Sequence, residues 1–167
     1  KGKKYASLNV GGKVANGEIL VFLDADTKLP SDFYNKILKV VSNSKSVGGA
    51  FEMRFDITNP SLNFIRLINS VRYNLSKRCY GDQAIFCTKE AFTLAGGYPE
   101  KIVLEAAHFC QNLKHVGLLH IIKDPVITSS RRFLEGGILK TFAFDVFLLT
   151  MYSLNINVDR WAKKYWD

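Results

Sequence analysis

Two patterns of apolar residues alternate along the chain, and they predict alternating strands and helices. Ile19–Leu23 is continuously apolar, which is typical of a strand buried on both faces. Val47–Asp56 alternates apolar and polar residues in its second half, as a half-buried strand does. The remaining strands are expected at Tyr80–Cys87, Leu118–Ile122 and Val126–Ser129.

Between these strands, apolar residues recur at the spacing of a helix. One helix is expected over Tyr5–Ala15, and another from Ser31, a good N-cap, to about Ser42. Asn59 opens a further helix, in which an apolar stripe is expected to face the core. The stripe consists of Leu62, Ile65, Ile68 and Leu75. The other predicted helices are Lys89–Ala95, Glu105–Val116 and Ile138–Leu154.

This alternation predicts an α/β fold with a mainly parallel sheet flanked by helices. At 167 residues, the chain is one domain that is long enough to bury a core. Gly136 and Gly137 separate the α/β part from the hydrophobic helix that follows. We therefore expect a core over residues 1–134 and a C-terminal helical extension over residues 135–167 that packs on it.

Lysine and arginine exceed aspartate and glutamate by eight, because the chain has 23 basic and 15 acidic residues. Such a surplus suits nucleotide phosphates, anionic lipid headgroups or nucleic acid. The basic residues are scattered, and no recognition-helix or RNA-binding signature accompanies them, so nucleic acid is not an expected partner. The composition, 47% hydrophobic and 13% aromatic, is that of a globular protein.

The cysteines indicate a reducing compartment. Cys79, Cys87 and Cys110 are odd in number and show no close metal-ligand spacing, which favours free thiols in the cytoplasm over a zinc site. The histidines are isolated from one another and are expected to be structural. No apolar run is long enough to cross a bilayer. The chain begins without Met, so we expect it to be a fragment whose upstream part is missing.

Two carboxylates, Asp24 and Asp26, directly follow the apolar run, and Pro30 then ends the strand region. In open parallel sheets, ligands bind beyond the carboxyl ends of the strands. Acids this close together repel one another unless a cation joins them. Mg²⁺ carrying phosphate oxygens is the natural occupant, because this ion is usually held by one or two carboxylates and by substrate phosphates. We favour this functional interpretation over a solvated turn.

Other polar residues follow predicted strands or begin helices, and each has two interpretations. Glu105 is either a base that deprotonates an acceptor hydroxyl or an acid that favours the helix dipole. Asp82 and Gln83 either bind a polar acceptor or satisfy backbone donors at the start of a strand. Arg131 and Arg132 either hold a diphosphate through charge-assisted hydrogen bonds, which we favour, or are a solvated pair.

Several of these motifs occur in a fixed order along the chain: Gly17–Asp26, Gly81-Asp82-Gln83, Gly96-Gly97-Tyr98-Pro99 before Glu105, Ser129–Phe133, Gly136-Gly137, Tyr152 and Asn155–Tyr165. In this order they resemble a family 2 glycosyltransferase of the GT-A fold, which is Rossmann-like. The likeness covers nearly the whole chain. The sequence is similar to small bacterial and archaeal members of the "transferase 2" type, some of which occur near radical-SAM genes.

The resemblance implies metal-dependent, inverting transfer of a sugar from a nucleoside-diphosphate donor to a hydroxyl acceptor. Asp24 would contact the donor ribose, and Asp26 would hold Mg²⁺ or Mn²⁺ on the diphosphate. The family usually has Glu-Asp where this chain has Glu105-Ala106, and that Asp is commonly the base. Here Glu105 would act as the base, with Asp82 as the second catalytic candidate. The donor-binding set also includes Lys3, Asn9, Arg131 and Arg132, and Asp82 and Gln83 would bind the acceptor.

The resemblance also implies that the opening strand-helix-strand of the family, which cradles the nucleotide base, is missing from this chain. Asn9 and Lys13 share a helix face, which either contacts the nucleotide or is ordinary surface. Ala106 leaves open a catalytically weak or inactive sugar-nucleotide-binding protein, and the charge leaves open a basic module that binds anions or membrane surfaces. The C-terminal helices either rest on a membrane, which suits a lipid-linked acceptor, or cap the core, which we favour.

Overall fold

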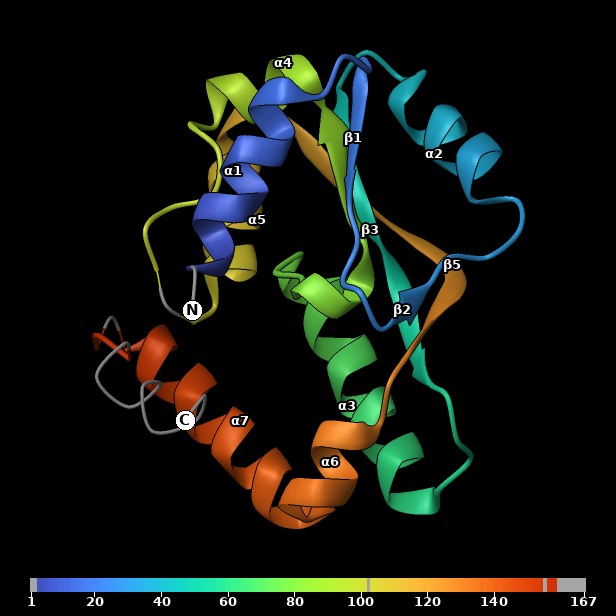
Figure 1. Cartoon of the computed structure of the whole chain (residues 1–167), viewed down its shortest axis with the longest axis vertical. Coiled ribbons are helices and arrows are strands. Elements are labelled where there is room, and N and C mark those ends of the chain that lie inside the picture. The colour runs from blue at the N-terminus through green and yellow to red at the C-terminus, as the bar shows by residue number, and fades with distance from the viewer. Residues whose placement is uncertain (1–2, 102, 155, 159–167) are drawn as a thin grey trace.

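The computed structural model describes residues 3–101, 103–154 and 156–158. Within this range the chain is α/β, as predicted, with helices against both faces of one sheet and beyond one of its ends (Figure 1). The five strands have the order β1-β4-β3-β5-β2. They are β1 (Ile19–Phe22), β2 (Thr27–Lys28), β3 (Ser46–Phe55), β4 (Ile85–Thr88) and β5 (Leu118–Thr128).

The sheet is mixed, so the prediction of a mainly parallel sheet is wrong. Among the described strands, β3 and β5 are parallel, whereas β1 and β4, β3 and β4, and β2 and β5 are antiparallel. The physical reason lies in α3 (Pro60–Ser76), which returns the chain to the end of the sheet at which β3 stops. A helix between two strands gives the same sequence pattern whether the second strand runs parallel or antiparallel to the first, so the pattern could not predict the direction of β4.

The sheet separates two buried clusters. On one side, α1 (Lys4–Val14), α4 (Lys89–Leu94) and α5 (Glu105–Val116) enclose a core that includes Leu20, Phe92 and Phe109. On the other side, α2 (Phe33–Val41) and α3 contribute Ile37 and Leu62 to a second core. The last helices, α6 (Arg131–Gly136) and α7 (Ile138–Ser153), lie beyond the same end of the sheet as α3 (Figure 1).

The predicted helices are confirmed with small shifts at their ends, but several strand predictions change. The two segments expected between residues 118 and 129 form one strand, β5. The segment expected as a strand from Tyr80 begins instead with the 3-10 turn η1 (Gly81–Gln83) before β4. In β1 only Leu20 is buried, because β1 is an edge strand paired with β4 alone among the described strands. The N-cap of α2 is Asp32, not Ser31.

The apolar stripe predicted on α3 divides between core and surface. Leu62 and Ile65 are buried with Tyr73, whereas Ile68 is 37% and Leu75 is 81% exposed. The buried residues share one face of the helix, and Ile68 and Leu75 lie on the other. The sequence prediction therefore combined two separate apolar faces of α3 into a single stripe. No helix in the described part of the chain is both long enough and apolar enough to cross a membrane.

Gly48 and Gly49 allow β3 to lie between its neighbours, since they pair with Cys87 and Phe86 of β4. A Cβ atom on Gly48 would overlap the carbonyl oxygen of Phe86, and one on Gly49 would overlap that of His120 in β5. These are backbone atoms of central strands, which move only if the sheet distorts. The spacing of the sheet thus depends on two residues without side chains.

We predict that Gly48→Ala lowers the free energy of unfolding by roughly 2 kcal/mol or more, as an overpacked core does. Gly11→Ala is the matched control, because a Cβ atom at Gly11 meets nothing within 4 Å. In that helical position, alanine should stabilise the protein by about 0.5–1 kcal/mol. Urea unfolding of both variants measures the difference, and equal stabilities would contradict the close approach at Gly48.

Candidate active site

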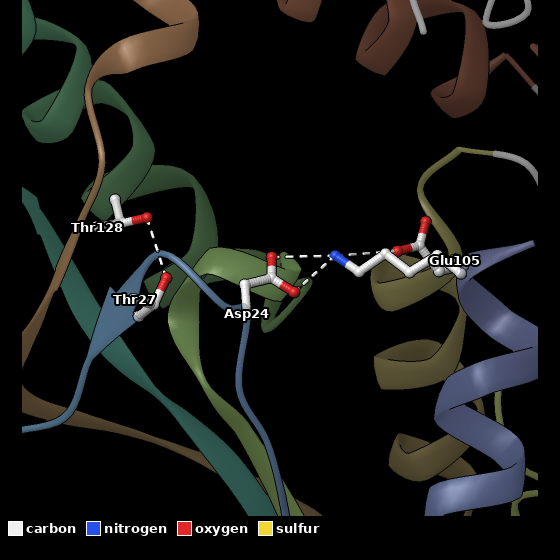
Figure 2. Close-up of polar contacts among 5 residues, drawn as sticks. Asp24, Thr27, Glu105 and Thr128 are labelled. Atoms are coloured by element: carbon white, nitrogen blue, oxygen red, sulfur yellow. Dashed lines mark hydrogen bonds and ion pairs between the residues drawn. The ribbon is translucent and has the colours of Figure 1, made fainter. Parts of the chain in front are cut away.

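An acidic cluster surrounds Lys4 beyond the C-terminal end of β1 (Figure 2). Asp24 follows β1 by two residues, Lys4 is the first residue of α1, and Glu105 is the first residue of α5. The Lys4 Nζ atom lies 2.8 Å from Asp24 Oδ1 and 3.0 Å from Asp24 Oδ2. It lies 3.7 Å from Glu105 Oε1. Segments from three parts of the sequence therefore meet around one cation.

Burial and charge shift the proton affinities of this cluster. Burial raises the pKa of Glu105, and the positive charge of Lys4 offsets only part of that rise. Burial alone would lower the pKa of Lys4, but the charge and hydrogen bond of Asp24 and the charge of Glu105 more than compensate, so this pKa is raised. Lys4 thus stays a cation, while Glu105 is a stronger base than an ordinary carboxylate. Ala106, its neighbour, is buried and has no group that could take a proton.

The 3-10 turn η1 brings Asp82 to the same place. A Cβ atom on Gly81 would lie 2.7 Å from Lys4 Nζ and 2.8 Å from Asp24 Oδ2, so the turn packs directly on this ion pair. Burial, followed by the negative charge of Asp24, raises the pKa of Asp82 to about 6. The cluster therefore contains Asp24, Asp82 and Glu105.

Gln83 holds this turn in place. Its Nε2 donates to the carbonyl of Phe51 at 3.1 Å, and its Oε1 accepts from the backbone N–H of Tyr80 at 3.0 Å. Gln83 is 1% exposed, and Ala84 after it adopts the left-handed conformation with φ of 47°. The predicted acceptor-binding role of Gln83 is thus replaced by a scaffolding role in the structure, because both ends of its amide are engaged inside the protein.

Asp26 lies in the exposed turn between β1 and β2. That turn is closed by a hydrogen bond from the N–H of Thr27 to the carbonyl of Asp24, at 3.1 Å. The buried hydroxyls of Thr27 and Thr128, 3.1 Å apart, connect β2 to β5 (Figure 2). Among the described residues, no group of three or more His, Cys, Asp and Glu side chains is placed to hold a metal.

Lys4, rather than the predicted Lys3, reaches the acidic cluster. Lys3 is exposed, and its ammonium group lies 5.7 Å from the ring of Tyr5. Nothing in the sequence distinguishes these adjacent lysines. Asn9 is also used internally, since its Nδ2 donates to the carbonyl of Tyr98 at 2.8 Å and its Oδ1 accepts from the N–H of Tyr98 at 2.7 Å.

The two arginines predicted to bind a diphosphate begin α6 and differ in their surroundings. Arg132 forms an ion pair with Asp145 of α7, and its guanidinium lies 5.1 Å from the ring of Phe133. Its positive charge also lowers the pKa of Asp82, which places it near the acidic cluster. Arg131 is exposed on the surface of the protein. The structure therefore associates Arg132, and not Arg131, with Asp82.

Comparison with models of known protein families gives no match, and comparison with curated proteins gives none either. What the site can do follows from its own groups: carboxylates with raised pKa values, one fixed cation and an exposed carboxylate two residues from Asp24. Such groups can accept a proton and can bind a ligand that is both hydroxylated and anionic.

We predict that Asp82 titrates with a midpoint near 6. Because this folded-state pKa lies above the ordinary value of 3.8, the native protein retains a proton that the unfolded chain has lost. The contribution to stability is fully present below about pH 4 and is lost as the pH rises through 6. Carbon-detected NMR of the carboxyl group measures the midpoint, and Asp24→Asn should lower it by removing a negative charge. An Asp82 midpoint near 3.8 would contradict the burial of this group.

We predict that Asn9→Ala lowers the free energy of unfolding by about 1–3 kcal/mol, because the N–H and carbonyl of Tyr98 lose their partner. The exposed Asn63 on α3 provides the control, and Asn63→Ala should change stability by less than about 0.5 kcal/mol. Chemical denaturation compares the two variants. Equal losses would show that the Asn9–Tyr98 contact contributes little.

Proposed function

We propose that the protein is a glycosyltransferase of the GT-A type, which transfers a sugar from a nucleoside-diphosphate donor to a hydroxyl acceptor. The observation that carries this proposal is the convergence of Asp24, Asp82 and Glu105 beyond the end of β1, around the ammonium of Lys4. Sugar transfer needs a base and groups that orient hydroxyls, and this cluster supplies both. The resemblance of the ordered motifs to family 2 glycosyltransferases supports the same reaction.

In this proposal, the donor lies along the end of β1. Asp24 contacts the ribose hydroxyls, and Arg132, which is ion-paired with Asp145 near the cluster, would exchange that partner for a donor phosphate. Asp26 would hold Mg²⁺ or Mn²⁺, and its exposed carboxylate fits an ion that completes its shell with phosphate oxygens. When bound, the ion would neutralise charge on the diphosphate leaving group. The proton transfer and the orientation of the acceptor are then carried out by side chains of the protein.

Glu105 takes the proton from the acceptor hydroxyl in this mechanism. Its raised pKa makes it a better base than an ordinary carboxylate, and its neighbour Ala106 offers no competing group. As the proton moves to Glu105, the acceptor oxygen forms a bond to the anomeric carbon. The bond from that carbon to the diphosphate breaks on the opposite face, so the configuration inverts. Asp82 orients the acceptor by accepting a hydrogen bond from a neighbouring hydroxyl of the same molecule, because the attacking hydroxyl gives its only proton to Glu105.

A sugar-nucleotide-binding protein without turnover is the second candidate. Lys4 contacts Glu105 as well as Asp24, and a base that is already paired with a cation is less able to accept a proton. This candidate predicts the same donor binding and no transfer. A module that binds anions through charge alone predicts instead that binding weakens steeply with salt and ignores the metal.

We expect UDP or GDP to bind more tightly in the presence of Mn²⁺ than in its absence. Asp26→Ala should weaken the metal-dependent binding about tenfold or more, equivalent to roughly 1.4 kcal/mol. Asp32→Ala is the matched control, because Asp32 is an exposed carboxylate outside the cluster. Titration calorimetry measures all of these affinities. Absence of metal-dependent binding to either nucleotide would remove the donor site from the proposal.

Turnover then separates the active transferase from the binding protein. Glu105→Gln should lower the rate of transfer, or of donor hydrolysis, by about 10²–10⁴-fold while nucleotide affinity stays within a factor of about two. The chemical change is small, since glutamine retains the shape of the side chain. Wild-type protein that binds the nucleotide without any turnover would favour the second candidate.

A further inference from the structure

A cavity of about 410 Å³ lies among α3, the η1 turn, α6 and α7. Its size is within the range of small-molecule sites. Apolar side chains form much of its wall, including Met53, Phe55, Ile68, Phe133, Phe142 and Leu149. Polar side chains gather in it as well, namely Arg72, Tyr80, Asp82, Arg132 and Asp145. Asp82 therefore belongs both to this cavity and to the acidic cluster around Lys4.

Three buried polar atoms that belong to cavity-lining residues have no hydrogen-bond partner among the described residues. They are Arg72 Nη2, Tyr80 Oη and Asp82 Oδ1. Such atoms are few in native proteins, and each costs about 1–3 kcal/mol when it is left unpaired. Within the described part of the chain, these three are the complete set of buried side-chain atoms of this kind, and all belong to residues that line one cavity. This coincidence points to a ligand.

The groups are held rigidly, as a binding site requires. Arg72 Nη1 donates to the carbonyl of Arg78 at 3.0 Å, and its Nε donates to Asn69 Oδ1 at 3.3 Å. The guanidinium carbon lies 4.2 Å from the centre of the Tyr80 ring. Arg72 is therefore fixed at two of its nitrogens, and Nη2 remains for a ligand. Burial raises the pKa of Tyr80, so its hydroxyl stays protonated and can donate.

The unpaired polar groups of the cavity-lining residues suit an anionic oxygen beside a hydroxyl. Arg132 and Asp145 form an ion pair, so their charges largely cancel. Arg72 contributes a positive charge that the carboxylate of Asp82 offsets in part, and its Nη2 donor has no partner among the described residues. The hydroxyl of Tyr80 adds a second donor. Asp82 Oδ1 accepts a hydrogen bond, which a ligand hydroxyl can supply. Each of the three atoms is satisfied by a molecule that carries both an anionic oxygen and a hydroxyl group.

We propose that this cavity binds the acceptor substrate, and that the acceptor is a phosphorylated or carboxylated polyol. Its anionic group contacts Arg72 and Tyr80, and one of its hydroxyls donates to Asp82. Because the turn that carries Asp82 packs on the Lys4–Asp24 pair, the acceptor is held next to the donor side of the site. The identification of the ligand as an acceptor rests on the proposed transferase function, whereas the ligand class rests on the cavity alone.

The same chemistry can come from a soluble molecule or from the headgroup of a lipid. Ile68 lines the cavity and also belongs to an exposed apolar face of α3, formed with Phe64, Leu67, Val71 and Leu75. Residues 57–81 contain four basic and no acidic side chains. Two of these, Arg66 and Arg72, are on α3, and Lys77 and Arg78 directly follow it. An exposed apolar face with basic residues near it is suited to an anionic membrane surface. The test below therefore has a soluble arm and a lipid arm.

The soluble arm measures binding of glucose 6-phosphate, glucuronate, glucose and inorganic phosphate by titration calorimetry, without nucleotide or metal. We expect both anionic polyols to bind at least about tenfold more tightly than glucose or phosphate, a difference of roughly 1.4 kcal/mol. Arg72→Lys and Tyr80→Phe should each remove most of this preference. Arg66→Lys is the matched control, because Arg66 is on the same helix and does not line the cavity.

The lipid arm uses phosphatidylcholine vesicles that contain phosphatidylinositol or, as an anionic lipid without a polyol, phosphatidylserine. Preference for phosphatidylinositol that Tyr80→Phe abolishes identifies a lipid headgroup as the source, and a preference confined to the soluble arm identifies a soluble acceptor. If neither arm shows the preference, or if Arg72→Lys and Tyr80→Phe leave it unchanged, the proposal is overturned.

Stability provides a check that is independent of the probes. Tyr80→Phe removes an unpaired hydroxyl and keeps the ring that contacts Arg72, so the thermal midpoint should stay the same or rise. A clear fall would mean that the hydroxyl already has a structural partner, which would overturn the proposal.

Nucleotide binding with Mn²⁺ is measured on the same variants. Its absence in the wild type would refute the transferase function and leave the binding of anionic polyols to be judged separately.

Discussion

One ammonium group, that of Lys4, stabilises a meeting of carboxylates that would otherwise repel one another. Asp24 and Glu105 contact it directly, and the backbone of the η1 turn packs against it so closely that Gly81 has no room for a side chain. The N-terminus of α1, the end of β1, the start of α5 and η1 are thereby held together. Loss of this cation would leave the end of the sheet with unbalanced negative charge.

The same region contains energetically unfavourable features that packing alone does not explain. Asp82 and Glu105 are held with raised pKa values, and buried atoms of Arg72, Tyr80 and Asp82 lack partners within the described structure. Proteins generally retain such features at functional sites, where a ligand or a reaction makes use of them. Asp82 connects the acidic cluster with the cavity, so in the proposed transferase a donor on one side and an acceptor on the other would meet at this residue.

The rest of the fold supplies a rigid frame for these groups. Gln83 anchors the η1 turn to β3 through the carbonyl of Phe51, and Asn9 anchors α1 to the backbone of Tyr98. Both side chains resemble ligand-binding residues in the sequence, since amides near strand ends and helix faces are typical of such sites. In the structure, their polar atoms satisfy backbone groups, and the positions of Lys4 and Asp82 depend on them.

The sequence by itself determined the α/β class and the position of nearly every helix, because periodicity is a local signal, and it identified Asp24, Asp82 and Glu105 as candidates. Only the tertiary structure decided that the sheet is mixed, since the direction of β4 depends on how α3 turns back. It also decided that Lys4 rather than Lys3 enters the cluster, because the orientation of α1 relative to β1 sets which lysine faces the acids. The sequence could not predict the cavity either, since Arg72, Tyr80 and Arg132 become neighbours only when α3, η1 and α6 pack together.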